Sequence, residues 1–353
     1  MAYTTINDPS AHFQAKIYTG TGASHNITND GPSDLQPDWV WVKNRGTTNG
    51  AGYQHQTYDS TRGVTKKLLP SSTNAESTDT NSLTAFNSNG FTSGSNVGIN
   101  ESNVGHVAMQ WKANGGTTSS NTSGTEDSVV QVNTDAGFSI VTATAPSSNG
   151  HWSFGHGLGV KPDMVITRQR SGGGWWTWHK DLTNQTTYYI GLNTDSAQTN
   201  EANMWGGGMT SSVVGVSSPN STLASEAYVA YCFAEVQGYS KFSSYLGNGS
   251  ANGPMVYTGF KPAFLIMKET SSAGGNWVMF DNKRDPYNVT KHRMFPNLIN
   301  GDNTTRDYID FYSNGFKMKN TDADHNQTKS TMIYMAFAEN PFVTSTGIPA
   351  TAR

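Results

Sequence analysis

Three oxygen-bearing side chains alternate at Asp322, Asp324 and Asn326, and this spacing is the first in the sequence that could do chemistry. Oxygen ligands at alternate positions begin the calcium loop of an EF-hand. That loop continues with a glycine and closes with a glutamate, but Gln327 and Ile333 hold those positions here. An EF-hand is therefore excluded. A polar hairpin tip is the favoured interpretation, a weak Ca²⁺ site at the three residues is the alternative, and we expect no cofactor.

The densest aromatic cluster is the run from Trp175 to Trp178, and a further tryptophan, Trp205, lies among glycines. Exposed aromatic rings are the groups on which sugars stack, and they are also common at subunit interfaces. Relative to the prolines described below, Trp176 and Trp178 are predicted to lie in a core. Trp175 is predicted to lie on the opposite face and to meet solvent. Trp175 and Trp205 are thus candidate glycan-binding residues, with subunit packing and ordinary core as the alternatives.

Catalytic motifs are missing from the sequence. It has no Gly-x-Ser-x-Gly elbow, no His-Glu-x-x-His and no Walker loop. A glycosidase on a sheet needs two carboxylates about 5 to 9 Å apart, which calls for acids two residues apart on one strand. Glu235 and Glu339 recur at similar places in the chain, but each stands alone. We therefore predict that the protein is not an enzyme and has no catalytic residues.

The charge balance excludes one class of function. Charged residues make up 14% of the chain, and 23 Lys and Arg against 26 Asp and Glu leave a net charge of −3. A nucleic-acid binder driven by bulk positive charge needs a surplus of Lys and Arg, so we expect no nucleic-acid partner. Cys232 is the single cysteine, which excludes an intrachain disulfide. With no long apolar stretch and no basic, apolar leader, we expect no membrane insertion and synthesis in a reducing cytoplasm.

Internal repeats are the strongest signal for the fold. Three segments share a proline followed by an apolar strand, and each is followed later by a second apolar strand rich in Ala and aromatic residues. The proline-led segments are 36–43, 161–168 and 261–268, and the later strands are 106–113, 228–235 and 332–339. A block with the sequence Ser-Asn-Gly-Phe occurs in the first and third repeats, at 88–91 and 313–316, and is missing from the second.

The repeats have the periodicity of strands. Trp39 and Trp41 point one way while Val40 and Val42 point the other, so both faces of this strand are apolar and it is buried between layers. Turn residues recur every 8 to 12 positions or so, as in an all-β sandwich or barrel. The best short helix candidate is 61–69. The sequence predicts an all-β fold of three tandem antiparallel β-sandwich (jelly-roll or lectin-like) domains with an extended C-terminal arm.

Composition also suggests where the domains begin and end. The expected divisions are a first repeat at 1–113, a flexible Gly/Ser/Thr-rich linker at 114–127, a second repeat at 128–236, a third repeat at 237–339 and the C-terminal arm at 340–353. The short junction between the second and third repeats predicts that these two pack against each other. The arm carries apolar residues, so it is expected to dock on its own domain or on a neighbouring subunit.

Several segments spread over the whole chain carry a resemblance to a known family. They are MAYTTINDPS (1–10), PDWVWVKNR (37–45), LTAFNSNGF (83–91), the run 230–264 and the ending IYMAFAENPFVTSTGIPATAR (333–353). Together they resemble structural proteins of marine tailed phages, of the cyanophage and pelagiphage type, described as tail-fibre-like with lectin-like sandwich domains. The second repeat departs most from this pattern.

This resemblance implies a non-enzymatic virion component, made in the bacterial cytoplasm and exposed on the virion surface as a capsid or tail decoration or an accessory fibre. Its expected partners are other phage virion proteins and further copies of itself, with a homotrimer as the expected assembly. The alternatives are an adhesin that binds a host-surface glycan and an enzyme that degrades glycans. Receptor-binding fibres carry a long shaft, and the absence of heptads here favours the decoration role.

Overall fold

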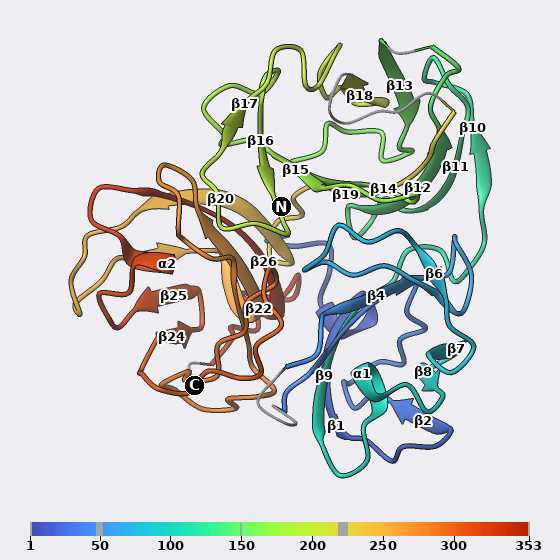
Figure 1. Ribbon diagram of the computed structural model, residues 1–353. Coiled ribbons are helices and arrows are strands. Elements are labelled where there is room, and N and C mark those ends of the chain that lie inside the picture. Colours follow the sequence, from blue (N-terminus) through green and yellow to red (C-terminus); the bar gives the residue numbers. More distant parts are fainter. Residues whose placement is uncertain (1, 47–51, 149, 218–224, 352–353) are drawn as a thin grey trace.

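The computed structural model describes residues 2–46, 52–148, 150–217 and 225–351. Strands account for nearly all of its regular structure, and the sheets gather in three regions that correspond to the three repeats (Figure 1). The fold class predicted from the sequence, all-β with three antiparallel sandwich regions, is confirmed. The helical segments of the described chain have three or four residues each, far fewer than a membrane-spanning helix needs.

The first repeat packs a four-stranded sheet, in the order β1-β9-β3-β4, against a three-stranded sheet, in the order β2-β8-β7. Its elements are η1 (Pro9–Ala11), β1 (Phe13–Thr19), β2 (His25–Thr28), β3 (Trp39–Asn44), β4 (Gln56–Asp59), β5 (Lys66–Lys67), β6 (Ser77–Thr78), β7 (Leu83–Asn87), β8 (Gly90–Ser93), α1 (Val97–Asn100) and β9 (Gly105–Trp111).

The second repeat has the same four central strands, in the order β12-β19-β14-β15, but extends the sheet on both sides to eight strands. A two-stranded sheet, β13-β18, covers it. The elements are β10 (Ser119–Asn121), β11 (Ser128–Asn133), β12 (Phe138–Thr144), β13 (His151–Gly155), β14 (Met164–Gln169), β15 (Trp175–His179), β16 (Tyr188–Gly191), β17 (Thr199–Asn200), β18 (Val213–Ser217) and β19 (Ala227–Phe233).

The third repeat returns to the simpler plan, with the sheet β20-β26-β22-β23 packed against β21-β25-β24. Its elements are β20 (Ser240–Leu246), β21 (Met255–Tyr257), β22 (Phe260–Glu269), β23 (Val278–Asp281), β24 (Ile309–Tyr312), β25 (Gly315–Met318), α2 (Ala323–Asn326) and β26 (Thr331–Pro341). The arm that follows turns back on itself, because Ala350 N–H donates to Phe342 O (2.8 Å). It docks on its own chain, where Ser345 exchanges hydrogen bonds with Asn7.

Register relates the three central sheets residue by residue. Trp39, Met164 and Phe264 each pair with the last aromatic residue of the neighbouring strand, at Trp111, Phe233 and Phe337 respectively. We call positions related in this way matched positions.

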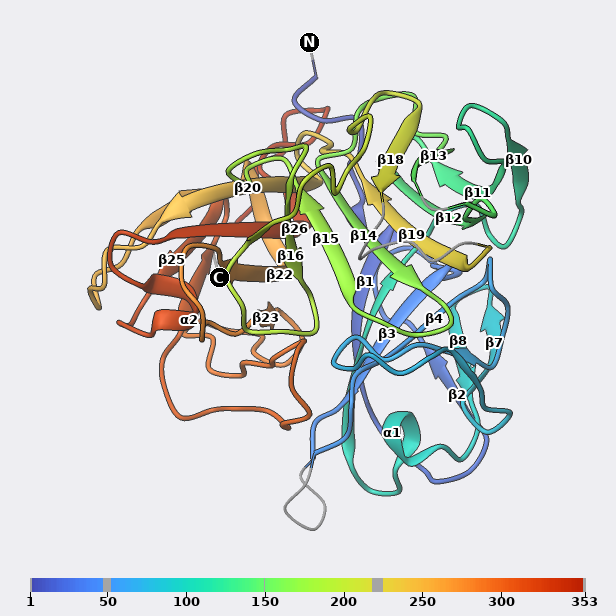
Figure 2. The same ribbon diagram turned by 45° about the horizontal axis from the view of Figure 1, so that its top comes forward.

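The larger sheets of all three repeats turn one face toward a common centre (Figures 1 and 2). Trp39 and Trp41 lie on that face, whereas Val40 and Val42 face the outer sheet of the first repeat, as their alternation predicted. The central core joins side chains of the three repeats, and Trp39 stacks on Trp111 (4.5 Å between ring centroids) and on Tyr231 of the second repeat (4.2 Å). Each repeat keeps a second, private core between its own two sheets.

Two local expectations need comment. The helix predicted at 61–69 is wrong: the segment turns and then forms β5, held by a pair of backbone bonds between Thr57 and Leu68. The segment 114–127, expected to be a flexible linker, carries β10, which pairs with β11, and Gly116 N–H donates to the Asp38 carboxylate (2.7 Å). Neither of these contacts can be read from composition.

Candidate functional site

The two tryptophans proposed as glycan-binding residues are both buried. Trp175 is 1% exposed and donates its indole N–H to Leu69 O of the first repeat (2.9 Å). Trp205 is fully buried and donates to Tyr188 O (2.8 Å). The expectation that Trp175 meets solvent is wrong, because the face opposite Trp176 and Trp178 is the face that packs into the central core. Neither ring therefore presents a free face to a sugar.

The candidate calcium ligands are held by an arginine. Arg293 Nη1 lies 2.9 Å from an Asp322 oxygen and 3.2 Å from an Asp324 oxygen. Asn326 turns its amide to backbone groups, donating to Asn320 O (2.8 Å). Because a guanidinium already contacts both carboxylates and would repel a cation bound between them, these residues do not fit a Ca²⁺ ion. Asp322 instead caps α2 by accepting a hydrogen bond from Asp324 N–H (3.1 Å).

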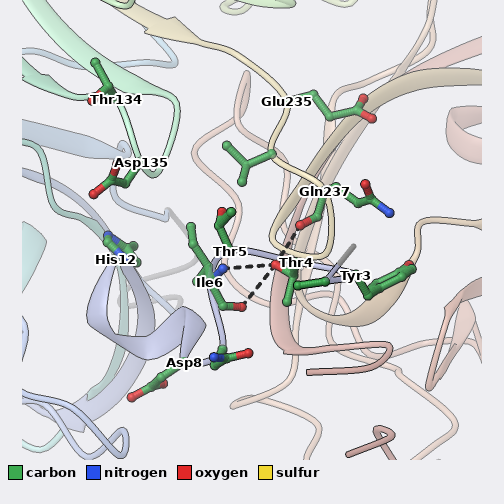
Figure 3. A pocket seen from close by; sticks show the side chains of 13 residues that line it. Tyr3, Thr4, Thr5, Ile6, Asp8, His12, Thr134, Asp135, Glu235 and Gln237 are labelled. Atoms are coloured by element: carbon green, nitrogen blue, oxygen red, sulfur yellow. Dashed lines mark hydrogen bonds between the residues drawn. The ribbon is translucent and has the colours of Figure 1, made fainter. Parts of the chain in front are cut away.

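A pocket of about 810 Å³ lies where the first strands of the three central sheets begin (Figure 3). The segment 2–8 and His12 of the first repeat line it, together with the 134–135 turn of the second repeat and the 235–237 junction to the third. Thr4 crosses the pocket and donates its hydroxyl to Gln237 O (2.8 Å), which ties the start of the chain to this junction.

Carboxylates of Asp8, Asp135 and Glu235 line this pocket, and its described lining has no Lys or Arg, but Glu235 is ion-paired with Lys241 (2.6 Å) and Lys180 (3.4 Å). Burial raises the pKa of Asp8, but hydrogen bonds from Ser10 and Ser33 outweigh it and hold this pKa below its usual value. Burial and the nearby Lys112 lower the pKa of His12. Asp8 and the Thr4 hydroxyl are thus already engaged with the protein, and both hold the segment 2–8 in place.

A serine and a histidine also meet in the second repeat. Ser217 Oγ lies 2.7 Å from His151 Nδ1 and donates its hydrogen to Asn203 O. A carbonyl oxygen can only accept, so His151 must donate to the serine and cannot remove its proton. This geometry is the reverse of an activated nucleophile.

Matched positions carry a set of buried cations that the sequence analysis missed. Lys43, Arg168 and Lys268 each reach a backbone carbonyl of a neighbouring repeat, at Ile299 (3.1 Å), Asn74 (2.5 Å) and Asp195 (3.4 Å) respectively. Burial lowers the pKa of Lys43 and Lys268 to about 8 and that of Arg168 to about 10. The signal was available, because each proline-led segment ends in a basic residue at the same distance from its proline.

A second matched position repeats the same connection. His55 Nε2 contacts Phe295 O (3.0 Å), Trp175 Nε1 donates to Leu69 O, and Trp277 Nε1 donates to Gly191 O (2.7 Å). In both sets of matched positions, the residue of the first repeat contacts the third repeat, that of the second contacts the first, and that of the third contacts the second. The three repeats are therefore joined in a closed ring with approximate threefold symmetry. The buried cations and the ring nitrogens at these two sets of matched positions join each repeat to the next.

Neither the curated proteins nor the solved structures that were searched contain a match to this chain. A family model covers residues 8–341, which is nearly all of the three repeats, and its description is "Domain of unknown function (DUF7483)". The chain therefore belongs to the DUF7483 family.

Proposed function

We propose that the protein is a non-enzymatic structural component of a tailed phage virion, exposed on the particle as a capsid or tail decoration or an accessory fibre protein. The resemblance of segments throughout the chain to marine phage structural proteins supports the class. The observation that carries the proposal is the closed ring: the largest side chains and the buried cations hold three sandwiches together as one rigid body.

This geometry favours a role in binding a symmetric particle. Virion surfaces present threefold and pseudo-threefold positions, and one chain with three similar sandwiches around a centre supplies by itself what three subunits would otherwise supply. A homotrimer, the assembly that the resemblance implies, is then not needed to place three sandwiches around an axis. Copies of the chain come together through the particle to which they bind.

The experiment is to locate the chain on intact virions of a phage that encodes it. Electron microscopy at side-chain resolution should show three sandwiches around one axis on the outer surface of the head or tail. Mass spectrometry of gradient-purified particles should find the chain at a fixed ratio to the major capsid protein. Its absence from washed, infectious particles would refute the proposal.

A second candidate function, recognition of a host-surface glycan, is favoured by one further observation. A cavity of about 160 Å³ is lined by Trp175, Trp176 and Tyr189 together with Asn193 and Thr194, although Trp175 itself is almost fully buried. Aromatic rings and polar side chains that line one cavity are the chemistry of a sugar subsite. Glycan-array binding that is lost in Tyr189→Ala would support this candidate, and an array without any binding would remove it.

A further inference from the structure

The junction between the first and second repeats contains a groove that the chain fills with its own strand. β11 pairs antiparallel with β12 and lies against the first repeat. The side-chain amide of Gln131, in the middle of β11, donates to Ser60 Oγ (2.8 Å) and to Thr61 Oγ1 (2.9 Å). This strand thus covers the edge of its own sheet and joins two repeats.

The corresponding edge of the first repeat has no such strand among the described residues. β1 matches β12, because Phe13 pairs with Trp111 as Phe138 pairs with Phe233. β1 is nevertheless the terminal strand in the order β1-β9-β3-β4, whereas β12 is followed by β11 and β10. An edge strand offers unpaired backbone donors and acceptors to another strand.

A cavity of about 200 Å³ lies at this uncovered edge, between the first and third repeats. Ala15 lines one side, and it matches Ile140, the residue opposite Gln131 in the filled groove. Asn282 and Lys283 line the other side and match Ser60 and Thr61.

The match between the two grooves extends to the backbone. Ser60 N–H donates to Asp38 O (2.9 Å), and Asn282 N–H donates to Ala263 O (2.9 Å). The cavity therefore adjoins residues 13–15 of β1, which match residues 138–140 of β12, the part of that strand that pairs with 131–133 of β11 in the filled groove.

An unsatisfied polar atom points to what the cavity would hold. Asn282 is 9% exposed, and its amide nitrogen donates to Glu339 (2.7 Å), but its carbonyl oxygen is buried without a hydrogen-bond partner among the described residues. A buried acceptor that lacks a donor costs about 1–3 kcal/mol. At the matched position, Ser60 Oγ accepts a hydrogen bond from the side-chain amide of Gln131.

We propose that this groove binds an extended polypeptide segment of a partner protein, added antiparallel to β1. The segment presents a side-chain amide, Gln or Asn, to Asn282 and carries β-branched residues on either side of it, as Val130 and Val132 flank Gln131. Strand addition to a sheet edge, with a pocket that reads one side chain, is a recurring mode of peptide recognition. The inference rests on the internal match between repeats and does not require the proposed virion role.

Ion pairs distinguish this groove from the junction between the second and third repeats. At the mouth of the cavity Asp30 contacts Lys283 (2.8 Å) and Lys16 (2.9 Å), but Asp30 is half exposed, and such pairs are worth about 0–1 kcal/mol. They can open for an incoming strand. At the junction between the second and third repeats, the residue that matches Asn282 is Lys180. Its ammonium contacts Asp163 (3.1 Å) and Glu235 (3.4 Å). The neutral acceptor is thus specific to the groove beside β1.

The experiment uses the full chain and a synthetic peptide of its own residues 127–134, which contains β11. Titration calorimetry should show saturable binding, and hydrogen exchange should show new protection of β1 amides. Asn282→Leu in the chain, or Gln131→Ala in the peptide, should weaken binding about tenfold, since one hydrogen bond to a buried acceptor is lost. Asp30→Asn should strengthen it. Ser60→Ala, at the matched position of the filled groove, is the control and should leave peptide affinity unchanged.

Several results would overturn the proposal. They are no binding at millimolar peptide, equal affinity for the peptide and its Gln131→Ala form, or protection at β20 in place of β1. The peptide variant is measured against the unmodified chain, so the test survives if Asn282→Leu fails to fold. A dimer of the chain alone, formed with protection of β1, would show that a second copy occupies the groove and would also refute a separate partner.

Discussion

The three junctions of the ring are closed by different chemistry. Between the first and second repeats, Arg62 is buried with Asp59 of the same repeat (2.5 Å), and Asp59 accepts a hydrogen bond from the hydroxyl of Tyr231 in the second repeat (2.8 Å). Between the third and first repeats, Arg284 is buried with Asp281 (2.5 Å) and contacts Asp302, which also contacts Arg45 of the first repeat (2.6 Å). The positions that match Asp59 and Arg62 in the second repeat hold His179 and Leu182, so the junction with the third repeat lacks this ion pair.

His179 replaces the ion pair with neutral hydrogen bonds. Its Nε2 contacts Tyr334 O of the third repeat (3.3 Å), and its Nδ1 accepts from Asp181 N–H (3.1 Å). Burial lowers the pKa of His179 to about 4, so its imidazole is uncharged at neutral pH. The comparison teaches that one fold can close the same interface by a compensated charge pair or by a neutral residue. The two solutions should fail under different conditions.

The largest expected effect comes from breaking one ion pair. Arg62→Leu gives the first repeat the residue that the second repeat has at this position, but it leaves Asp59 buried without its guanidinium. We expect the free energy of unfolding to fall by about 3–5 kcal/mol, measured by urea denaturation. Asp59→Leu combined with Arg62→Leu should recover most of that loss. A loss below 1 kcal/mol for the single variant, comparable with that of exposed Arg306→Leu, would contradict this account.

Acid should weaken the junction between the second and third repeats, where His179 is uncharged. The folded-state pKa of His179 lies below its value of about 6.5 in the unfolded chain, so the unfolded state binds more protons as the pH falls. Stability contributed by neutral His179 is therefore present above pH 6.5 and is lost as the pH falls toward 4. Other buried histidines, such as His106, add to this slope.

His179→Gln keeps hydrogen-bonding capacity without a titrating ring. Denaturation midpoints measured from pH 7 to 4.5 should show a shallower loss for this variant than for the wild type. The difference should reach at most about 1.4 kcal/mol per pH unit, the value for one proton. Parallel pH profiles for the two proteins would show that His179 is not the titrating group.

Alkaline conditions should act on the matched lysines. Burial holds the pKa of Lys268 near 8, below its usual 10.5, so the unfolded chain binds more protons between these values. Stability should therefore rise between pH 7.5 and 9.5, and Lys268→Met should flatten that rise. Arg168→Met is the matched control, because arginine stays protonated over most of this range. A wild-type profile that falls over this window would refute the prediction.

The smallest effect is expected from single hydrogen bonds between repeats. Trp175→Phe keeps an aromatic ring in the central core but removes the N–H that reaches Leu69 O. The expected loss is about 0.5–1.5 kcal/mol in urea denaturation, and Trp277→Phe at the matched position should lose a similar amount. Unequal losses would show that the threefold match does not extend to energetics.

The sequence was sufficient to predict the strands and the sandwich class, because alternation records which faces of a strand are buried. The segment from Trp39 to Val42 showed two apolar faces, and both are buried. Alternation does not say what covers each face. The inward face of every large sheet is covered by the other two repeats, which is why Trp175 was placed in solvent although it lies in the central core.

Candidate sites were harder to predict, because spacing shows which side chains share a face but not which neighbours compete for them. Asp322 and Asp324 have ligand spacing, but the guanidinium of Arg293, some thirty residues away, contacts both carboxylates. Conversely, Lys43, Arg168 and Lys268 have the same spacing from the three prolines, but their role was not predicted. Their role depends on carbonyls of other repeats, a contact that no local pattern records.

The shared core also constrains how the chain can be made. Phe13 and Trp111 belong to the first repeat, yet they pack against Phe264 and Phe337 of the third. While a ribosome is still synthesising the third repeat, this aromatic surface has nothing to bury it, and exposed apolar surface of that kind promotes aggregation. A chain truncated after the second repeat should therefore be far less soluble than the whole, even with two of its sandwiches complete.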